Sequence, residues 1–177
     1  LKESGYQVTS LLDYPDSIDV EETGATFVEN AILKAEAISK HYQRITIADD
    51  SGLSIDYLNG APGIFSARYA GENKSDEANL DKVLTELAGV PQEKRSARFH
   101  CALAIASPEK EVYTVEGICE GSITEKRVGD NGFGYDPIFK PKGKEVTMAQ
   151  LPKVEKNRIS HRADALKKLE TVFAKYF

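Results

Sequence analysis

Long hydrophobic runs are absent from this sequence of 177 residues. No apolar stretch approaches the roughly 20 residues that a membrane-spanning helix needs, and there is no signal-peptide pattern. We therefore predict a cytoplasmic protein without membrane association. With 41% hydrophobic and 29% charged residues, the composition is that of an ordinary globular protein. We expect a single domain over residues 1–177.

Cysteine is scarce, and an excess of positive charge is missing. Cys101 and Cys119 stand in apolar, strand-like surroundings without C-x-x-C or Cys/His ligand spacing. We interpret them as buried thiols rather than as a disulfide or metal ligands, although a strand pair could bring them close. The formal net charge of −5 argues against a nucleic-acid partner. A small anionic ligand held by a few cations remains compatible with it.

The glycine motifs of dinucleotide and P-loop sites are also absent, since neither G-x-G-x-x-G nor a Walker sequence occurs. A different glycine-rich segment covers residues 129–137 and contains Phe133 and Tyr135. Such glycine density allows the backbone to approach a ligand closely. The alternative is a tight loop with buried aromatic rings.

Two adjacent carboxylates are the most informative feature that is present. Residues 45–52 form a short β-branched run that ends in Asp49, Asp50, Ser51 and Gly52. We predict a buried strand there, and carboxylates near a core require a metal, a water to deprotonate or cationic neighbours. Adjacent strand residues point to opposite faces, so both carboxylates can share one ion only if the strand ends or twists between them. We therefore rank Asp50 above Asp49.

The remaining pattern indicates an α/β protein. Apolar periodicity and capping residues predict helices over residues 25–42 and 75–87 and from Ser160 to about Lys175. Strand signals cover residues 6–12, 53–58, 97–106 and 112–123, the last two as a hairpin, and residues 1–5 resemble the end of a helix. A long hairpin beside βα segments favours a mixed sheet.

Three cation-capable side chains occupy unusual positions on the predicted helices. Lys34 lies at the edge of an apolar stripe, where it either snorkels to water or points a cation into a cleft. His161 and Arg162 follow the N-cap candidate Ser160, in a first turn where cations oppose the helix dipole. This placement favours a role toward a ligand over a solvated helix start. His100, in contrast, is interpreted as a structural histidine.

Five segments together resemble the inosine triphosphate pyrophosphatase family, and they occur in family order across nearly the whole chain. They are E-E-T-G-x-T-F-x-E-N-A-x-x-K-A at residues 21–35, A-D-D-S-G-L at 48–53, G-A-P-G-I-x-S-A-R-Y at 60–69, G-F-G-Y-D-P at 132–137 and S-H-R at 160–162.

The resemblance implies Mg²⁺-dependent hydrolysis of non-canonical purine nucleoside triphosphates (ITP, dITP and XTP) to the monophosphate and pyrophosphate. It also implies an elongated, two-lobed α/β domain with a mixed central β-sheet, flanking helices and a nucleotide cleft between the lobes, assembled as a homodimer.

Residue roles follow from the same resemblance. Asp50 would be the general base that activates water, Glu22 with Asp50 and Asp49 would hold Mg²⁺, and Lys34 would contact the phosphates. Substrate-binding residues would be Ser51, Phe133, Gly134, Tyr135, Asp136, Lys156, His161 and Arg162, with Phe133 stacking on the base. A guanidinium has donors and no acceptor, so Arg162 would accept a 6-keto purine and reject the 6-amino group of adenine.

One departure concerns the start of the chain. The family opens with a strand and a Ser/Thr-x-Asn-x-x-Lys phosphate-binding motif, which this sequence lacks, and Leu1 would fall just after it. Because losing an inner strand would expose the sheet, we expect the complete protein to contain further N-terminal residues.

Two other functions remain open from the sequence. A Maf-like nucleotide pyrophosphatase is disfavoured by the Ser160-His161-Arg162 match. A catalytically silent nucleotide-binding or dimeric interaction protein is disfavoured because Glu22, Lys34 and Asp50 occur together.

Overall fold

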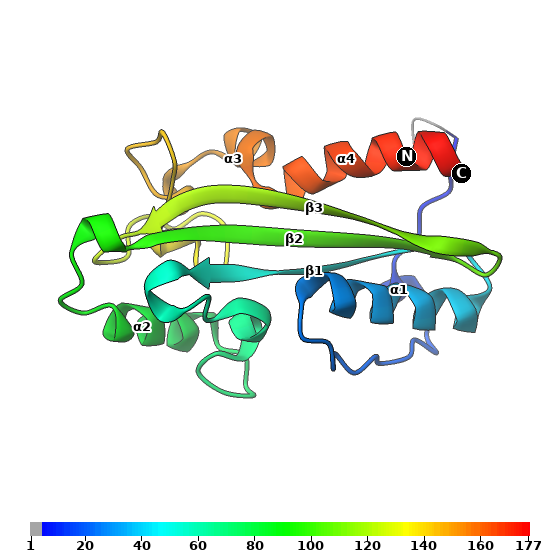
Figure 1. Cartoon of the computed structure of the whole chain (residues 1–177), viewed down its shortest axis with the longest axis horizontal. Coiled ribbons are helices and arrows are strands. Elements are labelled where there is room, and N and C mark those ends of the chain that lie inside the picture. The colour runs from blue at the N-terminus through cyan, green and yellow to red at the C-terminus, as the bar shows by residue number, and fades with distance from the viewer. Residues whose placement is uncertain (1–4) are drawn as a thin grey trace.

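The computed structural model describes residues 5–177, so the expected helix end at residues 1–5 falls almost entirely outside the described part. Figure 1 shows an elongated α/β molecule in which helices flank long strands. In chain order the elements are α1 (Phe27–Tyr42), β1 (Thr46–Ile55), α2 (Asp76–Glu86), β2 (Ser96–Ser107), β3 (Lys110–Ile123), β4 (Phe139–Pro141), α3 (Lys153–Ile159) and α4 (His161–Tyr176).

The sheet has the order β1-β2-β3-β4, and all three pairings are antiparallel. The α/β class, the hairpin and the predicted helices are confirmed, whereas the mixed pairing is wrong for the described strands. The strand predicted over residues 6–12 is absent, because residues 6–10 join no strand and Leu11–Asp13 is a 3-10 turn capped by Ser10.

Strand β1 is longer than the sequence analysis expected. Its ladder with β2 runs without a register shift from Thr46 to Ile55, so the run predicted over residues 53–58 continues the first strand. A 3-10 turn at Asp56–Leu58 follows. The strand neither ends nor breaks its pairing between Asp49 and Asp50, which therefore point to opposite faces.

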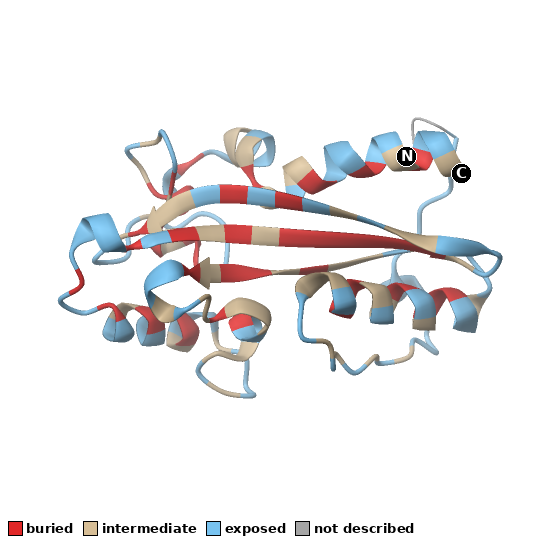
Figure 2. Cartoon of the chain, viewed as in Figure 1, coloured by how far each residue is buried: buried red, intermediate tan, exposed pale blue. Residues whose placement is uncertain are grey.

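Helices α1 and α4 cover opposite faces of the same end of the sheet (Figure 1). On one face, Ala31 and Ala35 of α1 pack on a row of alanines in β2, and these small side chains allow close approach. On the other face, Leu169 and Phe173 of α4 pack on the alternate residues of β2, including Leu103. Both faces of β2 are apolar from Cys101 to Ala106 for this reason, and Figure 2 shows β2 buried along this part of its length.

A larger core fills the other end of the molecule. It joins the ends of β1 and β3 with α2, β4 and the loops around them; its bulkiest members include Leu53, Ile55, Leu87, Phe99, Ile138 and Phe139. The molecule therefore has a hydrophobic core at each of its two ends.

Cys101 and Cys119 are buried and free, as predicted. None of the helices in the described chain is long and apolar enough to cross a membrane.

Helix α3 was not predicted. It directly precedes α4, and Ser160 ends the first helix while its Oγ accepts a hydrogen bond from the N–H of Ala163 in the second. Helix α3 buries no residue, so its sequence carries no apolar period that could reveal it.

Two arginines near the start of β2 differ sharply in burial. Arg95 is 2% exposed, and its guanidinium donates to the main-chain oxygens of Leu87, Val90, Ile123 and Thr124. It therefore connects the end of α2 to the end of β3. The oxygens of Leu87 and Ile123 also accept from the N–H of Val90 and the side chain of Gln92, whereas no other donor to the oxygens of Val90 and Thr124 is found among the described residues.

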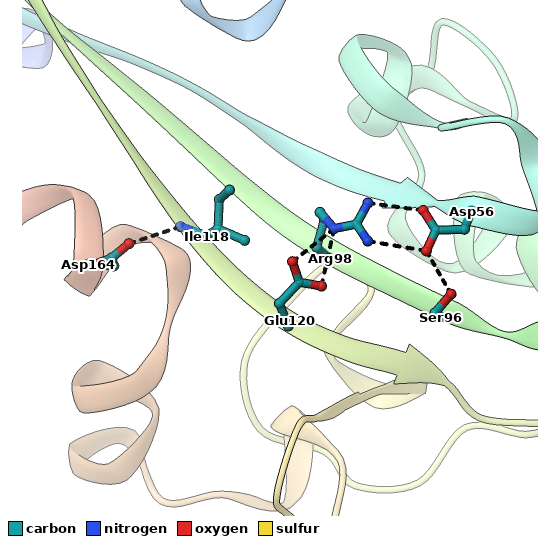
Figure 3. A network of polar contacts seen from close by, with 6 residues as sticks. All are labelled: Asp56, Ser96, Arg98, Ile118, Glu120 and Asp164. Carbon is teal, nitrogen blue, oxygen red and sulfur yellow. Dashed lines mark hydrogen bonds and ion pairs between the residues drawn. The ribbon is translucent and has the colours of Figure 1, made fainter. Parts of the chain in front are cut away.

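Arg98 of β2 lies on the accessible face of the sheet, where it joins β3 and the 3-10 turn that follows β1 (Figure 3). Its guanidinium donates to both oxygens of Asp56 at 2.9 and 3.1 Å and, through Nε, to Glu120. Ser96 donates to the same Asp56 carboxylate. Both acidic partners are about half exposed, so solvent screens these ion pairs.

The contrast predicts different costs for removing each guanidinium. We expect Arg95→Met to lower the free energy of unfolding by about 2–3 kcal/mol, because buried carbonyls lose their donors. Arg98→Met is the matched control and should cost less than about 1 kcal/mol. Urea unfolding followed by circular dichroism measures both, and equal losses would contradict this account of Arg95.

Candidate active site

The structure brings Glu22, Lys34 and Asp50 together on the α1 side of β1. The Nζ of Lys34 lies 3.6 Å from Oε2 of Glu22 and 3.7 Å from Oδ1 of Asp50. Asp50 is only 9% exposed. Of the two alternatives for Lys34, the ammonium thus points inward toward two carboxylates and does not snorkel away from them.

The loop before α1 is fixed to the helix by its own side chains. Thr26 caps α1, with its Oγ1 accepting from the N–H of Glu29 at 3.1 Å. The buried Asn30 accepts from the N–H of Gly24 at 2.7 Å, and a Cβ at Gly24 would lie 2.7 Å from that same amide oxygen. Glu22, two residues earlier, is thereby held near Lys34 and Asp50.

The environment of Asp50 disfavours its charge. Burial raises the pKa of its carboxyl to about 6, Lys34 opposes this shift, and the neighbouring Glu22 adds to it. Oδ2 of Asp50 is buried and accepts no hydrogen bond within the described chain. A carboxylate with such a pKa and an unused oxygen is suited to accept a proton or to hold a cation.

The donor set around Asp50 fits magnesium. Mg²⁺ prefers hard oxygen ligands, keeps several waters and commonly uses one or two carboxylates together with substrate phosphates. Glu22 and Asp50 supply two such carboxylates, and the free Oδ2 of Asp50 is available to a cation. Residues 5–177 contain no group of three or more acidic, histidine or cysteine side chains arranged to hold an ion. The fit is therefore to an ion shared with a ligand.

Asp49 lies apart from this cluster, on the α4 side of β1. Its Oδ2 accepts from Nη2 of Arg162 at 2.9 Å and, more weakly, from Oγ of Ser51 at 3.4 Å. The structure thus joins Asp49 to two of the predicted substrate-binding residues. It does not bring Asp49 to Glu22 and Lys34.

A cleft of about 1,070 Å³ opens on the α4 side of β1. It lies between the end of β1, the glycine-rich loop, α3 and the start of α4. All eight residues predicted to bind substrate line it: Ser51, Phe133, Gly134, Tyr135, Asp136, Lys156, His161 and Arg162. Their roles toward a ligand stay predictions, but segments far apart in sequence meet in one cavity.

The glycine-rich loop presents the ring of Phe133 to the cleft. This ring is 66% exposed, and the Nζ of Lys156 lies 4.6 Å from its centroid. The carboxylate of Asp136 accepts from Lys156 at 2.5 Å and from the N–H of Phe133 at 3.1 Å. Gly132 has a φ of 75°, and a Cβ there would lie 2.1 Å from Oδ2 of Asp136, so glycine is required.

Tyr135 anchors the same loop in the core. Its ring is buried, and its hydroxyl donates to the main-chain oxygen of Ser66 at 2.6 Å, while burial raises its pKa. The N–H of Gly134 donates to Asp76 in the first turn of α2. These bonds fix both flanks of the loop and leave the Phe133 ring free for a planar ligand.

The start of α4 approaches the sheet very closely. A Cβ at Gly117 of β3 would lie 2.1 Å from the main-chain oxygen of His161, so only glycine allows this contact. The imidazole of His161 stacks on Phe99 at 4.9 Å. Burial lowers its pKa to about 4, which leaves the ring neutral at pH 7. Its buried Nδ1 has no partner among the described residues and is available to a ligand.

Several other residues that line the cleft have no role predicted from the sequence, among them Ser66, Asp76 and Phe99. Ser66 stands within the segment at residues 60–69 that carried the family resemblance, so a signal was present. Asp76 follows the N-cap of α2, where an acidic residue is ordinary. Phe99 belongs to the alternating apolar residues of β2, and this pattern indicates burial but no role toward a ligand.

A model of the Ham1 family matches residues 1–172 of this chain. The dITP/XTP pyrophosphatase of Bacillus licheniformis is 62% identical over 172 residues, which cover 97% of this chain and 88% of that protein. The dITP/XTP pyrophosphatase of Bacillus subtilis is 59% identical over 169 residues, covering 96% and 85%.

Solved structures agree with these sequence relatives. The Staphylococcus aureus Ham1 protein superposes with a TM-score of 0.92 at 46% identity, over 98% of this chain and 90% of that chain. The dITP/XTP pyrophosphatase of Mycobacterium abscessus gives a TM-score of 0.82 at 45% identity, over 95% and 87%. The resemblance drawn from the five sequence segments is confirmed, and the chain belongs to the Ham1 family.

Proposed function

We propose that this chain is a Mg²⁺-dependent pyrophosphohydrolase that converts ITP, dITP and XTP to the monophosphate and pyrophosphate. The observation that carries the proposal is the cluster of Glu22, Lys34 and Asp50 on β1, the strand whose next residues, Ser51 and Gly52, line the cleft. The names of its relatives support the same reaction and substrates.

The protein's own groups account for the proton and charge requirements of hydrolysis. The free Oδ2 of Asp50 accepts the proton of the attacking water, and a pKa of about 6 keeps this base mostly ionised at pH 7. The Lys34 ammonium neutralises phosphate oxygens. When bound by Glu22 and Asp50, Mg²⁺ would supply further positive charge against the triphosphate.

Base recognition uses the other part of the site. The exposed ring of Phe133 offers a stacking surface. Arg162 offers N–H donors that pair with a 6-keto oxygen and find no acceptor in the 6-amino group of adenine. Lys156 and the neutral His161 complete the polar lining of the cleft.

The proposal extends to assembly and location. We propose a cytoplasmic homodimer, as the family resemblance implies. Two buried free thiols are compatible with a reducing compartment. Sedimentation velocity tests the dimer directly, and a single species of 19.5 kDa would contradict it.

A Maf-like pyrophosphatase and a silent nucleotide-binding protein are the competing functions. Membership of the Ham1 family weighs against the first, and the intact acid and lysine cluster weighs against the second. Pyrophosphate release from ITP, dITP, XTP, ATP and GTP, with and without Mg²⁺, separates all three. Equal release from ATP and ITP would favour a different base preference, and no release would favour a binding protein.

Asp50→Asn tests the general base. We expect kcat for dITP to fall by about 10²–10⁴-fold because the amide cannot accept the proton of water, while nucleotide affinity changes little. Asp56→Asn at the end of the same strand is the control, since Asp56 pairs with Arg98 outside the cleft, and it should retain wild-type turnover. Unchanged turnover in Asp50→Asn would refute the assignment.

Phe133→Ala tests the stacking surface. We expect KM for dITP to rise by about 10-fold, since base–aromatic stacking contributes about 1–3 kcal/mol. Phe65→Ala removes another exposed aromatic ring, which lies outside the cleft, and should leave KM unchanged. Steady-state kinetics provides the measurement, and a Phe133→Ala enzyme with the KM of the wild type would argue against stacking.

A further inference from the structure

Asp49 has a defined environment that the proposed reaction does not use. The unbroken ladder of β1 pairs Asp49 with Leu103, whose side chain packs under α4. Asp50, one residue later, points to the α1 side, where Lys34 lies. Because adjacent strand residues face opposite ways, the two neighbouring carboxylates belong to different environments.

The contacts of Asp49 all lead toward the cleft. Its Oδ2 receives the Nη2 donor of Arg162 at 2.9 Å and the Oγ donor of Ser51 at 3.4 Å. Cys101, which is opposite Ser51 in the ladder of β1 and β2, is buried and has a free thiol. Both polar partners of Asp49 line the cleft, whereas Asp49 itself is not part of the lining.

A contribution to folding stability does not explain the ion pair between Asp49 and Arg162. The side chains of Asp49 and Arg162 are 45% and 47% exposed, and ion pairs at such positions contribute little to folding. Arg162 lies in the first turn of α4, where the helix dipole disfavours a cation. A carboxylate opposite offsets that cost and fixes the direction of the guanidinium.

A guanidinium is a planar group with five N–H donors. Fixing one nitrogen against a carboxylate sets the orientation of the plane and leaves donors for a second acceptor. Arg162 borders the same cavity as Phe133 and His161, and only its Nη2 donates to Asp49. Asp49 therefore controls which way the donors point when a base enters.

We propose that Asp49 is a positioning residue for purine recognition, which aims Arg162 into the cleft from the face of β1 opposite Asp50, and that it is not a ligand of the metal ion. The inference rests on the proposed function, because it specifies how the same site reads its base. The adjacent acids then divide the work: Asp50 serves the reaction, and Asp49 serves base recognition through Arg162.

The experiment compares Asp49→Ala, Arg162→Ala and the double variant in steady-state hydrolysis of dITP. If Asp49 acts through Arg162, each single variant raises KM by about 10-fold, and the double variant raises it no further. The kcat stays within about threefold of the wild type, and the Mg²⁺ concentration for half-maximal activity is unchanged. Asp49→Glu retains the carboxylate and should recover most of the loss in KM.

A binding measurement separates recognition from turnover. Calorimetric titration with dIMP in the absence of Mg²⁺ should show about 10-fold weaker binding in Asp49→Ala, since loss of a correctly aimed charged donor costs roughly one order of magnitude. Glu120→Ala removes the carboxylate partner of another exposed arginine, Arg98, and is the matched control. It should leave dIMP binding and KM at wild-type values.

Several results would overturn the inference. A higher Mg²⁺ requirement or a loss of kcat like that of Asp50→Asn would identify Asp49 as an ion ligand. Multiplying effects in the double variant would show that Asp49 does not act through Arg162. If the wild type is active and Asp49→Ala changes neither KM nor dIMP affinity, this inference alone is refuted. If the wild type hydrolyses no purine triphosphate, the proposed function is refuted together with it.

Discussion

The uninterrupted pairing of β1 with β2 determines how the site is divided. From Thr46 to Ile55 every residue of β1 has a partner, so the side chains must alternate between the two faces. Asp50 consequently meets Lys34 on the α1 side, while Asp49 meets Arg162 on the α4 side. A bulge at this point would move one carboxylate to the other face and disrupt both groups. Two chemical tasks thus depend on the regularity of one strand.

The burial of Asp50 is tolerated because its neighbours shift the pKa of its carboxyl in opposite directions. Desolvation and Glu22 raise its pKa, and Lys34 lowers it, so the pKa of about 6 is a compromise among the three. A more exposed carboxylate would be a weaker base, and one without Lys34 would have a higher pKa. Helix α1 supplies Lys34 and, through Asn30 and Thr26, the attachment of the loop that carries Glu22. The electrostatics of the site therefore rest on the packing of α1 against the sheet.

Much of this arrangement could be predicted from the sequence, because the informative residues are polar side chains in costly places. Two adjacent acids after a β-branched run, and His161 with Arg162 at a helix start, each require an explanation that a solvated surface does not give. The elements that were not predicted correctly lack such a signal. Helix α3 buries nothing, residues 6–10 alternate without a sheet to join, and the continuity of β1 through Ser54 depends on its ladder with β2. Outside the β2–β3 hairpin, sheet pairing joins segments that are distant in sequence, and local patterns do not encode it.

Ser66 connects β1 to the glycine-rich loop that presents Phe133. Its Oγ accepts from the N–H of Leu53 at 2.9 Å and donates to the main-chain oxygen of Gly63 at 2.6 Å, which holds the Gly63–Arg68 turn against β1.

Gly52 permits this approach, since a Cβ there would lie 2.6 Å from both the Gly63 oxygen and the Ser66 hydroxyl. The main-chain oxygen of Ser66 in turn receives the hydroxyl of Tyr135. A chain of short contacts therefore runs from the residues that follow Asp50 to the loop that presents Phe133. The distance between the reacting group and the stacking ring is set by buried hydrogen bonds, which resist displacement far better than exposed ion pairs do.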